Sequence, residues 1–368
     1  MKFTFVVHRP YHLVRSIDLV MKLREEYGSD MSATIIIFDL VYDLSQKYAK
    51  TREYHSDFKL EEVFDHVVTL TRKNEESIFK IFKFIGYYKQ KVKDYSQIVA
   101  SHPADRVFIF SDKEKPVEIL SSIYKTQKAR ILMVDEGHAS YARKGSRMKY
   151  IIKRILIFFF GFRKISKTVY YGESKIVEKA LVNLPKYTTI RNKIEQLPSF
   201  KIDSVKKYYK GQDNLTNSKN LIYVSNIVNY LFDIPWEQEK AVMTRLCELA
   251  RANGYDFVVK PHPVEEDEKY KEIEGSILLD KKYPSELLFN GQNIFISCKS
   301  SVLINARIAN QKVADISSIY QINNDNSIFR KLEIPLVNNV EELFSVSSGM
   351  LESVTPVSSE VRDILVFN

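Results

Sequence analysis

The first half of the chain alternates short apolar runs with longer amphipathic stretches. Runs rich in β-branched and aromatic residues predict strands at Phe3–Val7, Ala33–Phe38, His66–Leu70, Arg106–Phe110, Arg130–Val134 and Thr168–Tyr171. Between the runs, apolar residues recur at three- and four-residue steps, which predicts helices over Tyr11–Tyr27, Glu76–Tyr95 and Lys115–Lys125. Strands that alternate with helices are typical of βαβ units, so we expect an α/β domain built on a parallel sheet.

The same alternation starts again after a polar stretch at Lys201–Asn220. It predicts strands at Leu221–Val224, Phe257–Lys260, Ile277–Leu279, Ile294–Ser297 and Lys312–Ala314, and helices over Glu237–Asn253, Tyr283–Phe289 and Val302–Ala309. We therefore predict two Rossmann-like βα domains, residues 1–205 and 216–368, an arrangement that allows the last residues to pack back on the first domain. Open α/β sheets bind ligands at the carboxyl ends of their strands, so we expect a central cleft that both domains face.

Composition narrows the function classes. Of the 368 residues, 45% are hydrophobic and 27% are charged, as in a globular protein with a sizeable core. Cys247 and Cys298 form no CxxC or Cys/His pattern, which argues against a disulfide framework and a cysteine zinc site and indicates a reducing, cytoplasmic setting. No GxGxxG or GxxxxGK[ST] loop occurs, so neither a dinucleotide fingerprint nor a P-loop is expected. The opening run Met1–Val7 lacks a signal-peptide pattern and is interpreted as a strand.

The formal net charge of +9 is concentrated in one segment. Between His138 and Gly172 there is no acid, and the whole excess of basic residues lies there: Arg143, Lys144, Arg147, Lys149, Lys153, Arg154, Arg163, Lys164 and Lys167. The remainder of the chain is neutral, which argues against a nucleic-acid binder. Apolar residues interleave the charges, so we predict that segment 143–167 docks on an anionic membrane surface. A polyanionic acceptor and a core helix with basic ends are the alternatives. Its most apolar stretch, Ile155–Phe162, is too short to cross a bilayer.

Two acids and a glycine follow one predicted strand of the first domain. The strand Arg130–Val134 leads into Asp135-Glu136-Gly137, and glycine lets the backbone turn away while a carboxylate enters the cleft. Burial beside apolar residues and a second acid would raise the pKa of such a carboxyl group toward that of a general base. The alternative is an ordinary solvated turn, since acids and glycine are common turn residues.

Two further motifs follow predicted strands of the second domain. Lys260-Pro261-His262-Pro263 holds a histidine on a stiff extended turn beside a cation, which suits a phosphate or a leaving-group charge. Ser300 and Ser301 precede the predicted helix Val302–Ala309, where hydroxyls and free backbone N–H groups bind anions. The alternatives are a histidine in a proline-rich loop and a plain N-cap serine. We predict no metal site, because Asp65, Asp105 and Asp112 are isolated and no DxD pattern is present.

The order and placement of these motifs resemble a known family. An acid-acid-Gly turn, then His-Pro, then a serine pair, together with the opening Arg9-Pro10-Tyr11-His12-Leu13, is similar to bacterial sialyltransferases. The likeness is strongest to the lipooligosaccharide sialyltransferases of glycosyltransferase family 52 and to the capsular polysialyltransferases. It implies a GT-B fold and an inverting, metal-independent transfer of sialic acid from CMP-sialic acid to a cell-surface glycan. With the cysteine usage and the basic segment, we expect an enzyme of the cytoplasm, peripheral to the inner face of the cell membrane, with no cofactor beyond its donor substrate.

The resemblance also implies residue roles. The turn that ends at Gly137 supplies the base, with Glu136 as the first choice and Asp135 in reserve. His262 with Pro263 contacts the CMP phosphate, His262 acts as an acid toward it, and Ser300 and Ser301 hold its oxygens. Lys260 is added here for its charge and position. The Asp-Glu order and the following His138 depart from the family pattern, so the choice of base stays open. Another GT-B transferase, one that builds a teichoic-acid-like polymer, and a non-catalytic protein that binds anionic surfaces are the alternative functions.

Overall fold

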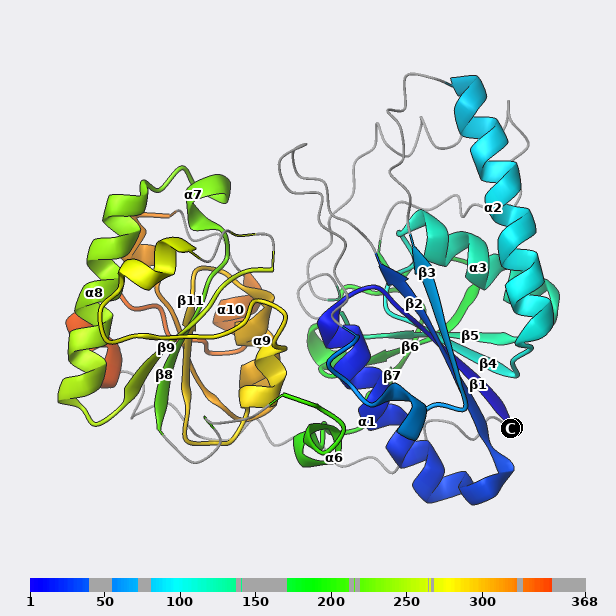
Figure 1. The fold of residues 1–368 in the computed structure, drawn as a ribbon, viewed down its shortest axis with the longest axis horizontal. Helices are drawn as coiled ribbons and strands as arrows, with labels where there is room; N and C mark the ends of the chain where they lie inside the picture. Colours follow the sequence, from blue (N-terminus) through cyan, green and yellow to red (C-terminus); the bar gives the residue numbers. More distant parts are fainter. Residues whose placement is uncertain are drawn as a thin grey trace. The chain divides into compact units, whose positions relative to one another are not determined.

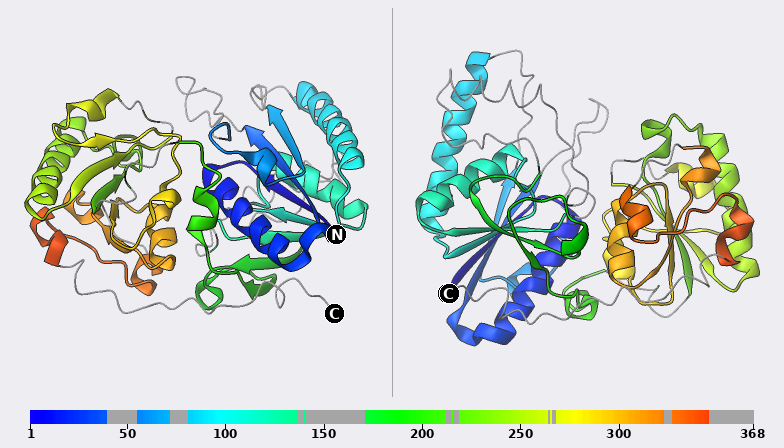
Figure 2. Two further views of the ribbon diagram at one scale, coloured as in Figure 1. Left: turned by 60° about the horizontal axis from the view of Figure 1, so that its bottom comes forward. Right: turned by 180° about the vertical axis from the view of Figure 1, so that it is seen from behind.

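The structure is a computed structural model, and it describes residues 1–39, 55–71, 81–136, 140, 171–211, 215, 219–263, 265, 268–322 and 327–345. The chain divides into two compact units, Met1–Ser199 and Phe200–Val357. Each unit is built on a parallel sheet with helices on its faces, as Figures 1 and 2 show. The return of the last residues to the first domain is an expectation that lies outside the described residues.

The described part of the first unit forms a seven-stranded parallel sheet in the order β3-β2-β1-β4-β5-β6-β7. Its strands are β1 Lys2–Val7, β2 Ser32–Asp39, β3 His66–Thr71, β4 Arg106–Ile109, β5 Arg130–Val134, β6 Val177–Val182 and β7 Lys193–Gln196. The chain adds β2 and β3 on one side of β1 and then β4 to β7 on the other. The strand order therefore reverses between β1 and β4, the place where open α/β sheets bind ligands.

Strands β6 and β7 were not expected from the sequence. The apolar run of β6 is interrupted by Glu178 and Lys179, which hides it from a hydrophobicity pattern. Lys179 is nevertheless buried, because its ammonium pairs with the carboxylate of Glu195 on β7. The strand predicted over Thr168–Tyr171 is not seen where it is described: Tyr171 lies in a turn, and residues 168–170 are outside the described part.

Helices cover both faces of the first sheet. Tyr95 of α2 (Ile81–Ser101) and Leu120 of α3 (Lys115–Thr126) share one apolar cluster with Val6 and Ile36 of the strands. Phe3 points to the opposite face, where its ring lies 5.7 Å from that of Tyr27 in α1 (Pro10–Tyr27). Among the helices in the described part of the chain, none is long and apolar enough to span a membrane.

A buried ionic cluster on α1 holds the end of the first unit. Asp18 accepts from Arg15 and from Lys22, each at 2.6 Å, and all three side chains are almost fully buried. Arg15 also donates to the carbonyl of Pro198, and Lys22 to that of Ser199. Charged side chains are buried only where such partners exist, so this cluster anchors the last residues of the unit onto α1.

The described part of the second unit forms a five-stranded parallel sheet in the order β10-β9-β8-β11-β12. Its strands are β8 Asn220–Val224, β9 Asp256–Lys260, β10 Ile277–Leu278, β11 Ile294–Ser297 and β12 Lys312–Asp315. Helices α8 (Trp236–Ala252) and α9 (Ser301–Ile308) lie on opposite sides of the sheet (Figure 1), and the shorter helices are α6 Ile202–Lys206, α7 Val228–Leu231 and α10 Ser327–Lys331. The helix predicted over Tyr283–Phe289 is the 3-10 helix Ser285–Leu288, which follows Pro284.

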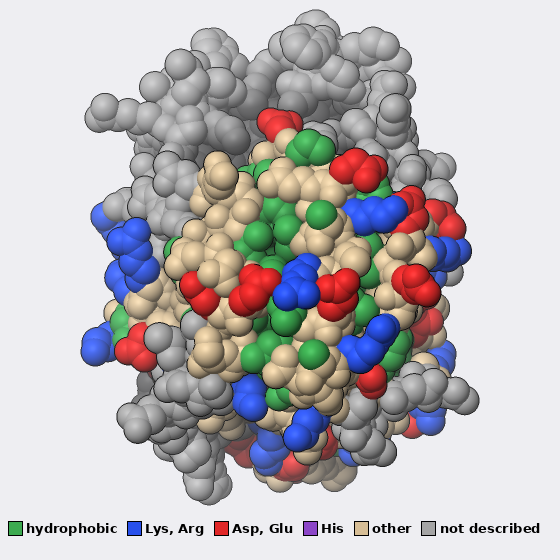
Figure 3. Space-filling view, turned by 90° about the vertical axis from the view of Figure 1, so that its left-hand side faces the viewer, with side chains coloured by type: hydrophobic (Ala, Val, Ile, Leu, Met, Phe, Trp, Pro, Cys, Tyr) green, Lys and Arg blue, Asp and Glu red, His purple; other side chains and the backbone are tan. Residues whose placement is uncertain are grey.

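The face of the second unit seen in Figure 3 carries basic and acidic side chains in a mixture. Ion pairs occur in this unit: Arg245 contacts Glu248 and Glu341, both at 3.0 Å, and Lys240 contacts Glu272 at 2.7 Å. A mixed face agrees with the sequence arithmetic, in which the part of the chain outside the basic segment is neutral. The basic segment 143–167 itself lies outside the described residues.

Candidate active site

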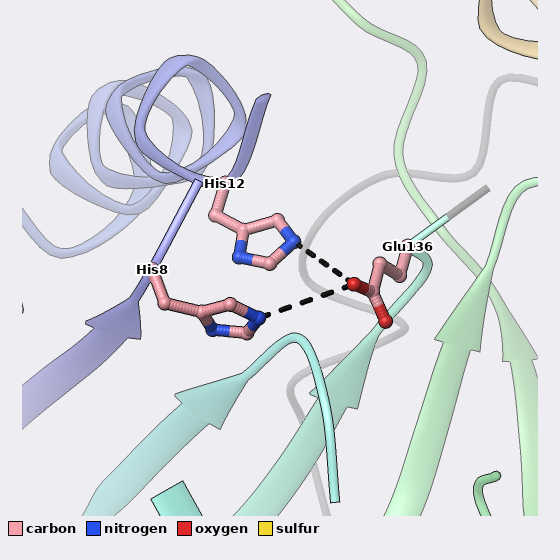
Figure 4. A group of neighbouring side chains, drawn as sticks. All are labelled: His8, His12 and Glu136. Atoms are coloured by element: carbon pink, nitrogen blue, oxygen red, sulfur yellow. Dashed lines mark ion pairs between the residues drawn. The ribbon is translucent and has the colours of Figure 1, made fainter. Parts of the chain in front are cut away.

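Three polar side chains converge on one carboxylate oxygen of Glu136 at the carboxyl edge of the first sheet. Oε1 of Glu136 lies 2.8 Å from the Arg9 guanidinium, 3.7 Å from Nε2 of His12 and 3.9 Å from Nε2 of His8. Figure 4 shows both imidazole rings pointing at this carboxylate. His8, His12 and Glu136 are buried, whereas the Arg9 side chain is 43% exposed. The group therefore has three buried members and one member that reaches solvent.

The strand order brings these residues together from distant parts of the sequence. His8 directly follows β1, Glu136 is the second residue after β5, and β4 lies between these two strands. Pro10 begins α1 directly after β1, a position that suits proline because its missing N–H would be unpaired there. His12 thus lies in the first turn of the helix. Its ring stacks on that of Phe110, the residue after β4, with the ring centroids 4.4 Å apart. His8 and His12 therefore lie beside the reversal of strand order between β1 and β4, and Glu136 faces them from the end of β5.

Burial sets the protonation of the group. Removal from water raises the pKa of Glu136 from 4.5 to about 7, although the Arg9 guanidinium opposes the rise. Burial also lowers the pKa of His8 and of His12 well below the ordinary value, so both rings are neutral at pH 7. A carboxylate with a pKa near 7 is suited to take up a proton in a general-base step at neutral pH.

The two adjacent acids have different environments. Asp135 is fully buried, and its Oδ2 accepts from the backbone N–H of Asn183 at 3.0 Å and from the Asn183 side chain at 2.9 Å. Its carboxylate therefore joins β5 to the loop after β6. Glu136 is the acid that faces the histidines. Gly137, the third member of the predicted turn, lies outside the described residues.

A braced turn supplies Tyr171 beside Glu136. Asp112 accepts from the backbone N–H groups of Gly172 and Ser174, both at 3.0 Å, and so holds the turn in place. Gly172 has a φ of +72°, and a Cβ there would lie 2.7 Å from Ile190, so only glycine fits. The Tyr171 hydroxyl donates to the carbonyl of Phe110 at 2.5 Å. Asp112, which looks isolated in the sequence, is thus a structural brace in the fold.

The two motifs of the second unit meet at the carboxyl edge of its sheet. Lys260 of β9 pairs in register with Val224 of β8, and Ser297 of β11 donates to the Val224 carbonyl at 2.5 Å. The three strands therefore end at one level. Because parallel strands present their carboxyl ends to the same edge, His262 after β9 and Ser300 after β11 flank the loop after β8.

The His-Pro turn is fixed by a buried carboxylate. Glu265 accepts from the backbone N–H of His262 at 3.0 Å, and its own N–H donates to the His262 carbonyl at 2.9 Å. The same carboxylate accepts from the Tyr270 hydroxyl at 3.0 Å and from the Lys269 ammonium at 3.1 Å. His262 and Pro263 remain partly exposed, so the imidazole is held in place and accessible.

Lys260 lies beneath the turn. Its side chain is almost fully buried, and its ammonium donates to the carbonyls of Pro261 at 2.8 Å and of Lys281 at 3.0 Å. The positive charge therefore supports the backbone that carries His262.

The serine pair begins α9. The Ser300 side chain accepts from the backbone N–H of Val302 at 3.3 Å, which is an N-cap, and Ser301 is exposed in the first position of the helix. Lys299, just before the cap, has a φ of +51°, a conformation that costs a non-glycine residue free energy. Asn226, from the loop after β8, donates to the Cys298 carbonyl at 2.7 Å and ties the two loops together. Strained and cross-braced loops of this kind are typical of ligand-binding edges.

The role of His8 and His12 was missed from the sequence. His12 appears there only within the opening motif, and His8 only as the residue after a predicted strand. Two histidines four residues apart, directly after a strand, are the signal that points to them. This signal gains meaning only when the strand order places β1 near β5.

The family comparison covers most of the chain. The model of the family alpha-2,8-polysialyltransferase (POLYST) matches residues 4–320, a range that includes His8, Glu136, His262 and Ser300. The match confirms the sialyltransferase resemblance at the family level, whereas membership of glycosyltransferase family 52 stays a prediction. No curated protein matches the chain significantly.

Similar solved structures share the fold at low sequence identity. A putative UDP-N-acetylglucosamine 2-epimerase from Listeria monocytogenes has a TM-score of 0.57 at 11% identity, over 98% of this chain and 93% of that one. The UDP-GlcNAc 2-epimerase from Neisseria meningitidis, bound to UDP-GlcNAc, has a TM-score of 0.54 at 14% identity, over 96% and 92%. A structure described as the glycotransferase of kitacinnamycin has a TM-score of 0.54 at 10% identity, over 96% and 91%. These likenesses confirm the expected GT-B class of fold.

Proposed function

The chain belongs to the alpha-2,8-polysialyltransferase family of glycosyltransferases, and on this premise we propose that it is an inverting sialyltransferase. It transfers sialic acid from CMP-sialic acid to a hydroxyl group of a cell-surface glycan. The observation that carries the proposal is Glu136: a buried carboxylate at the carboxyl edge of the first sheet, with a pKa raised to about 7. Family membership supports the sialyl donor, and the site supports the proton transfer.

Glu136 acts as the general base. The acceptor oxygen forms a bond to the anomeric carbon of sialic acid while the bond from that carbon to the CMP phosphate oxygen breaks. The proton of the acceptor hydroxyl goes to Glu136, and the electron pair of the broken bond stays on the phosphate. Because His8 and His12 are neutral, they add no positive charge that would weaken the carboxylate as a base.

The edge of the second sheet takes the nucleotide part of the donor. His262 faces the phosphate and donates a proton or a hydrogen bond to it, with Pro263 stiffening the turn. Ser301 and the N-terminal end of α9 bind phosphate oxygens, and Ser300 holds this helix start in shape. Fixed donors of this kind neutralise a leaving phosphate, so transfer proceeds without a divalent cation.

The basic segment 143–167 directs the enzyme to a membrane. It begins a few residues after Glu136 in the sequence and alternates basic with apolar residues. Such a composition favours the headgroup region of an anionic leaflet. We place the enzyme in the cytoplasm on the inner face of the cell membrane, where an anionic glycan acceptor is assembled.

Release of CMP from CMP-sialic acid, measured with the full chain in chelator-treated buffer, tests the proposal. We expect turnover that depends on a glycan acceptor and that falls about 1000-fold in Glu136→Gln, within the range for loss of a general base. Glu178→Gln is the matched control, because this acid of the same unit pairs with Lys125 and Arg130 away from the edge. No CMP release, or turnover of UDP-GlcNAc in its place, would overturn the sialyl assignment. Full activity in Glu136→Gln would overturn the role of the base.

A further inference from the structure

The two imidazoles beside Glu136 lack a hydrogen-bond partner at every ring nitrogen within the described part of the chain. Nδ1 and Nε2 of His8 and of His12 are buried, and among the described residues none of these four atoms has a hydrogen-bond partner. Buried polar atoms in native proteins nearly always have a partner, and an exception points to a bound water, ion or substrate group. One ring nitrogen of each histidine and a carboxylate oxygen of Glu136 lie within 4.8 Å of one another, and both rings point at this carboxylate (Figure 4).

We propose that His8, His12 and Glu136 bind a divalent cation of the zinc class. Two imidazoles and one carboxylate are a frequent ligand set for Zn²⁺, and three protein ligands leave a fourth position open. Bonds of about 2.1 Å place the ligand atoms of a tetrahedral site about 3.4 Å apart. Oε1 of Glu136 lies 3.7 Å from Nε2 of His12 and 3.9 Å from Nε2 of His8, so small side-chain shifts bring the carboxylate to this spacing from each ring.

The state of the ligands suits a metal ion. An imidazole binds metal only when neutral, and burial keeps both rings neutral. His12 is held by its stack on Phe110, at 4.4 Å, and His8 by its edge-on contact with His12, at 4.3 Å. These two contacts restrict how far either ring can turn away from Glu136.

Arg9 opposes the ion. Its guanidinium occupies Oε1 of Glu136 at 2.8 Å, and a second cation there meets direct repulsion. Because the Arg9 side chain is 43% exposed, it can turn into solvent when the ion enters. Arg9 and the metal ion thus compete for one carboxylate oxygen, which sets the sign of a mutational test.

The ion acts as an inhibitor of transfer, a consequence that rests on the proposed function. A divalent charge on Glu136 lowers its affinity for a proton and removes the general base. Transfer needs no metal and is blocked by Zn²⁺, so the site makes the enzyme responsive to the supply of this ion.

Metal binding is tested on the purified full chain after removal of metal with a chelator. Titration with Co²⁺ is followed by the visible absorption of four-coordinate cobalt, and titration with Zn²⁺ by calorimetry. We expect one ion per chain and a Zn²⁺-dependent rise in melting temperature. His12→Gln and Glu136→Gln, which roughly preserve side-chain volume, should each weaken binding by about 100-fold. His102→Gln is the matched control, because it removes a histidine from the other imidazole pair, His66 and His102, and should leave binding unchanged.

Arg9→Gln should change the affinity for the metal ion in the opposite direction. It should tighten Co²⁺ and Zn²⁺ binding about fivefold, the worth of a half-exposed ion pair. Binding that is unaffected by His12→Gln and Glu136→Gln in variants with native circular dichroism overturns the proposal, as does a looser site in Arg9→Gln. Activity separates the two proposals: Co²⁺ binding without sialyl transfer sinks only the proposed function, and transfer without Co²⁺ binding sinks only the metal site.

Discussion

At the scale of single residues, two opposing influences act on Glu136: it is almost fully buried, and it has an ionic contact with Arg9. Burial raises its pKa and Arg9 lowers it, and the result of about 7 lies where a base is most useful. The groups that face it or act on its charge are His8, Arg9, His12, Asp112, Glu114 and Tyr171. Of these, Arg9 is the group that most lowers the pKa.

We expect kcat/KM for sialyl transfer to rise with pH through about 7, as Glu136 loses its proton. Arg9→Gln removes the cation that favours the carboxylate, so the rising limb should move to higher pH. Initial rates across pH 5 to 9, roughly, are the measurement. A limb that stays at the same pH in Arg9→Gln would show that another group controls the reaction.

The same shift affects stability. A carboxyl group whose pKa rises from 4.5 to about 7 on folding binds its proton more tightly in the folded state. Its contribution to the free energy of unfolding is therefore complete below pH 4.5 and is lost as the pH rises to about 7. At about 1.4 kcal/mol per pKa unit the loss is of the order of 3 kcal/mol. Urea unfolding of the wild type against Glu136→Gln measures it, and a constant difference between the two across this range would contradict the shift.

Ser300 caps α9 and lies beside the proposed phosphate site, and substitution can separate these two effects. Ser300→Ala removes the N-cap of α9 and should lower the free energy of unfolding by about 1 kcal/mol. Ser300→Asp keeps a cap but adds a negative charge beside the donor phosphate, so CMP affinity should fall about tenfold with stability retained. Calorimetry with CMP and urea unfolding give the two values.

The control for Ser300 is a second cap in the same unit. Asn339 accepts from the backbone N–H of Glu342 at 3.0 Å, so Asn339→Ala should cost stability and leave CMP binding intact. Wild-type CMP affinity in Ser300→Asp would remove Ser300 from the donor site.

At the scale of elements, the edge of the second sheet depends on a carboxylate that was not expected from the sequence. Glu265 accepts from His262, Lys269 and Tyr270 together, which only a carboxylate can do. The turn that carries the imidazole is therefore held through Glu265. Prolines on both sides of His262 restrict its backbone but do not fix where the turn points.

Glu265→Gln should raise KM for the donor about tenfold and change kcat little, because the amide cannot accept all three donors and the His262 turn loosens. Steady-state kinetics with CMP-sialic acid measure both constants. Glu268→Gln is the control, since this nearby acid begins the 3-10 helix Glu268–Glu272, is 76% exposed and pairs with Lys271 three residues on. A loss of stability in Glu265→Gln with an unchanged KM would leave Glu265 a purely structural role.

At the scale of the whole molecule, charge separates one segment from the remainder of the chain. The face in Figure 3 mixes both signs, whereas the basic excess lies between residues 138 and 172. Replacing Phe158, Phe159 and Phe160 with Ser should move the protein from the pellet to the supernatant when it is sedimented with anionic vesicles, with CMP release retained.

The matched control replaces three exposed apolar residues elsewhere with Ser: Leu231, Ile277 and Leu336. This variant should still sediment with the vesicles. Equal loss of sedimentation in both variants would contradict a docking role for the segment, and unfolding of the phenylalanine variant would favour the core alternative.

The sequence by itself determined the rhythm of both sheets and the positions of the motif residues. Strands β1, β5 and β11 and helix α8 follow from local periodicity, because buried runs and amphipathic faces are written in neighbouring residues. Local order also places Glu136, His262 and Ser300 after strands, and so at the edges where parallel sheets bind ligands. Strand β6 was not predicted from local periodicity, because it contains the charged residue Lys179, which is buried only through its partner on β7.

Only the tertiary structure decided which side chains share a site. It turned Glu136 toward His8 and His12 and tied Asp135 to Asn183, although the two acids are adjacent in the sequence. It also buried Lys260 beneath its turn. The reason is physical: strand order joins residues that are far apart along the chain, and the burial that follows sets their charge. Neither the strand order nor the burial of these side chains can be read from a local pattern of residues.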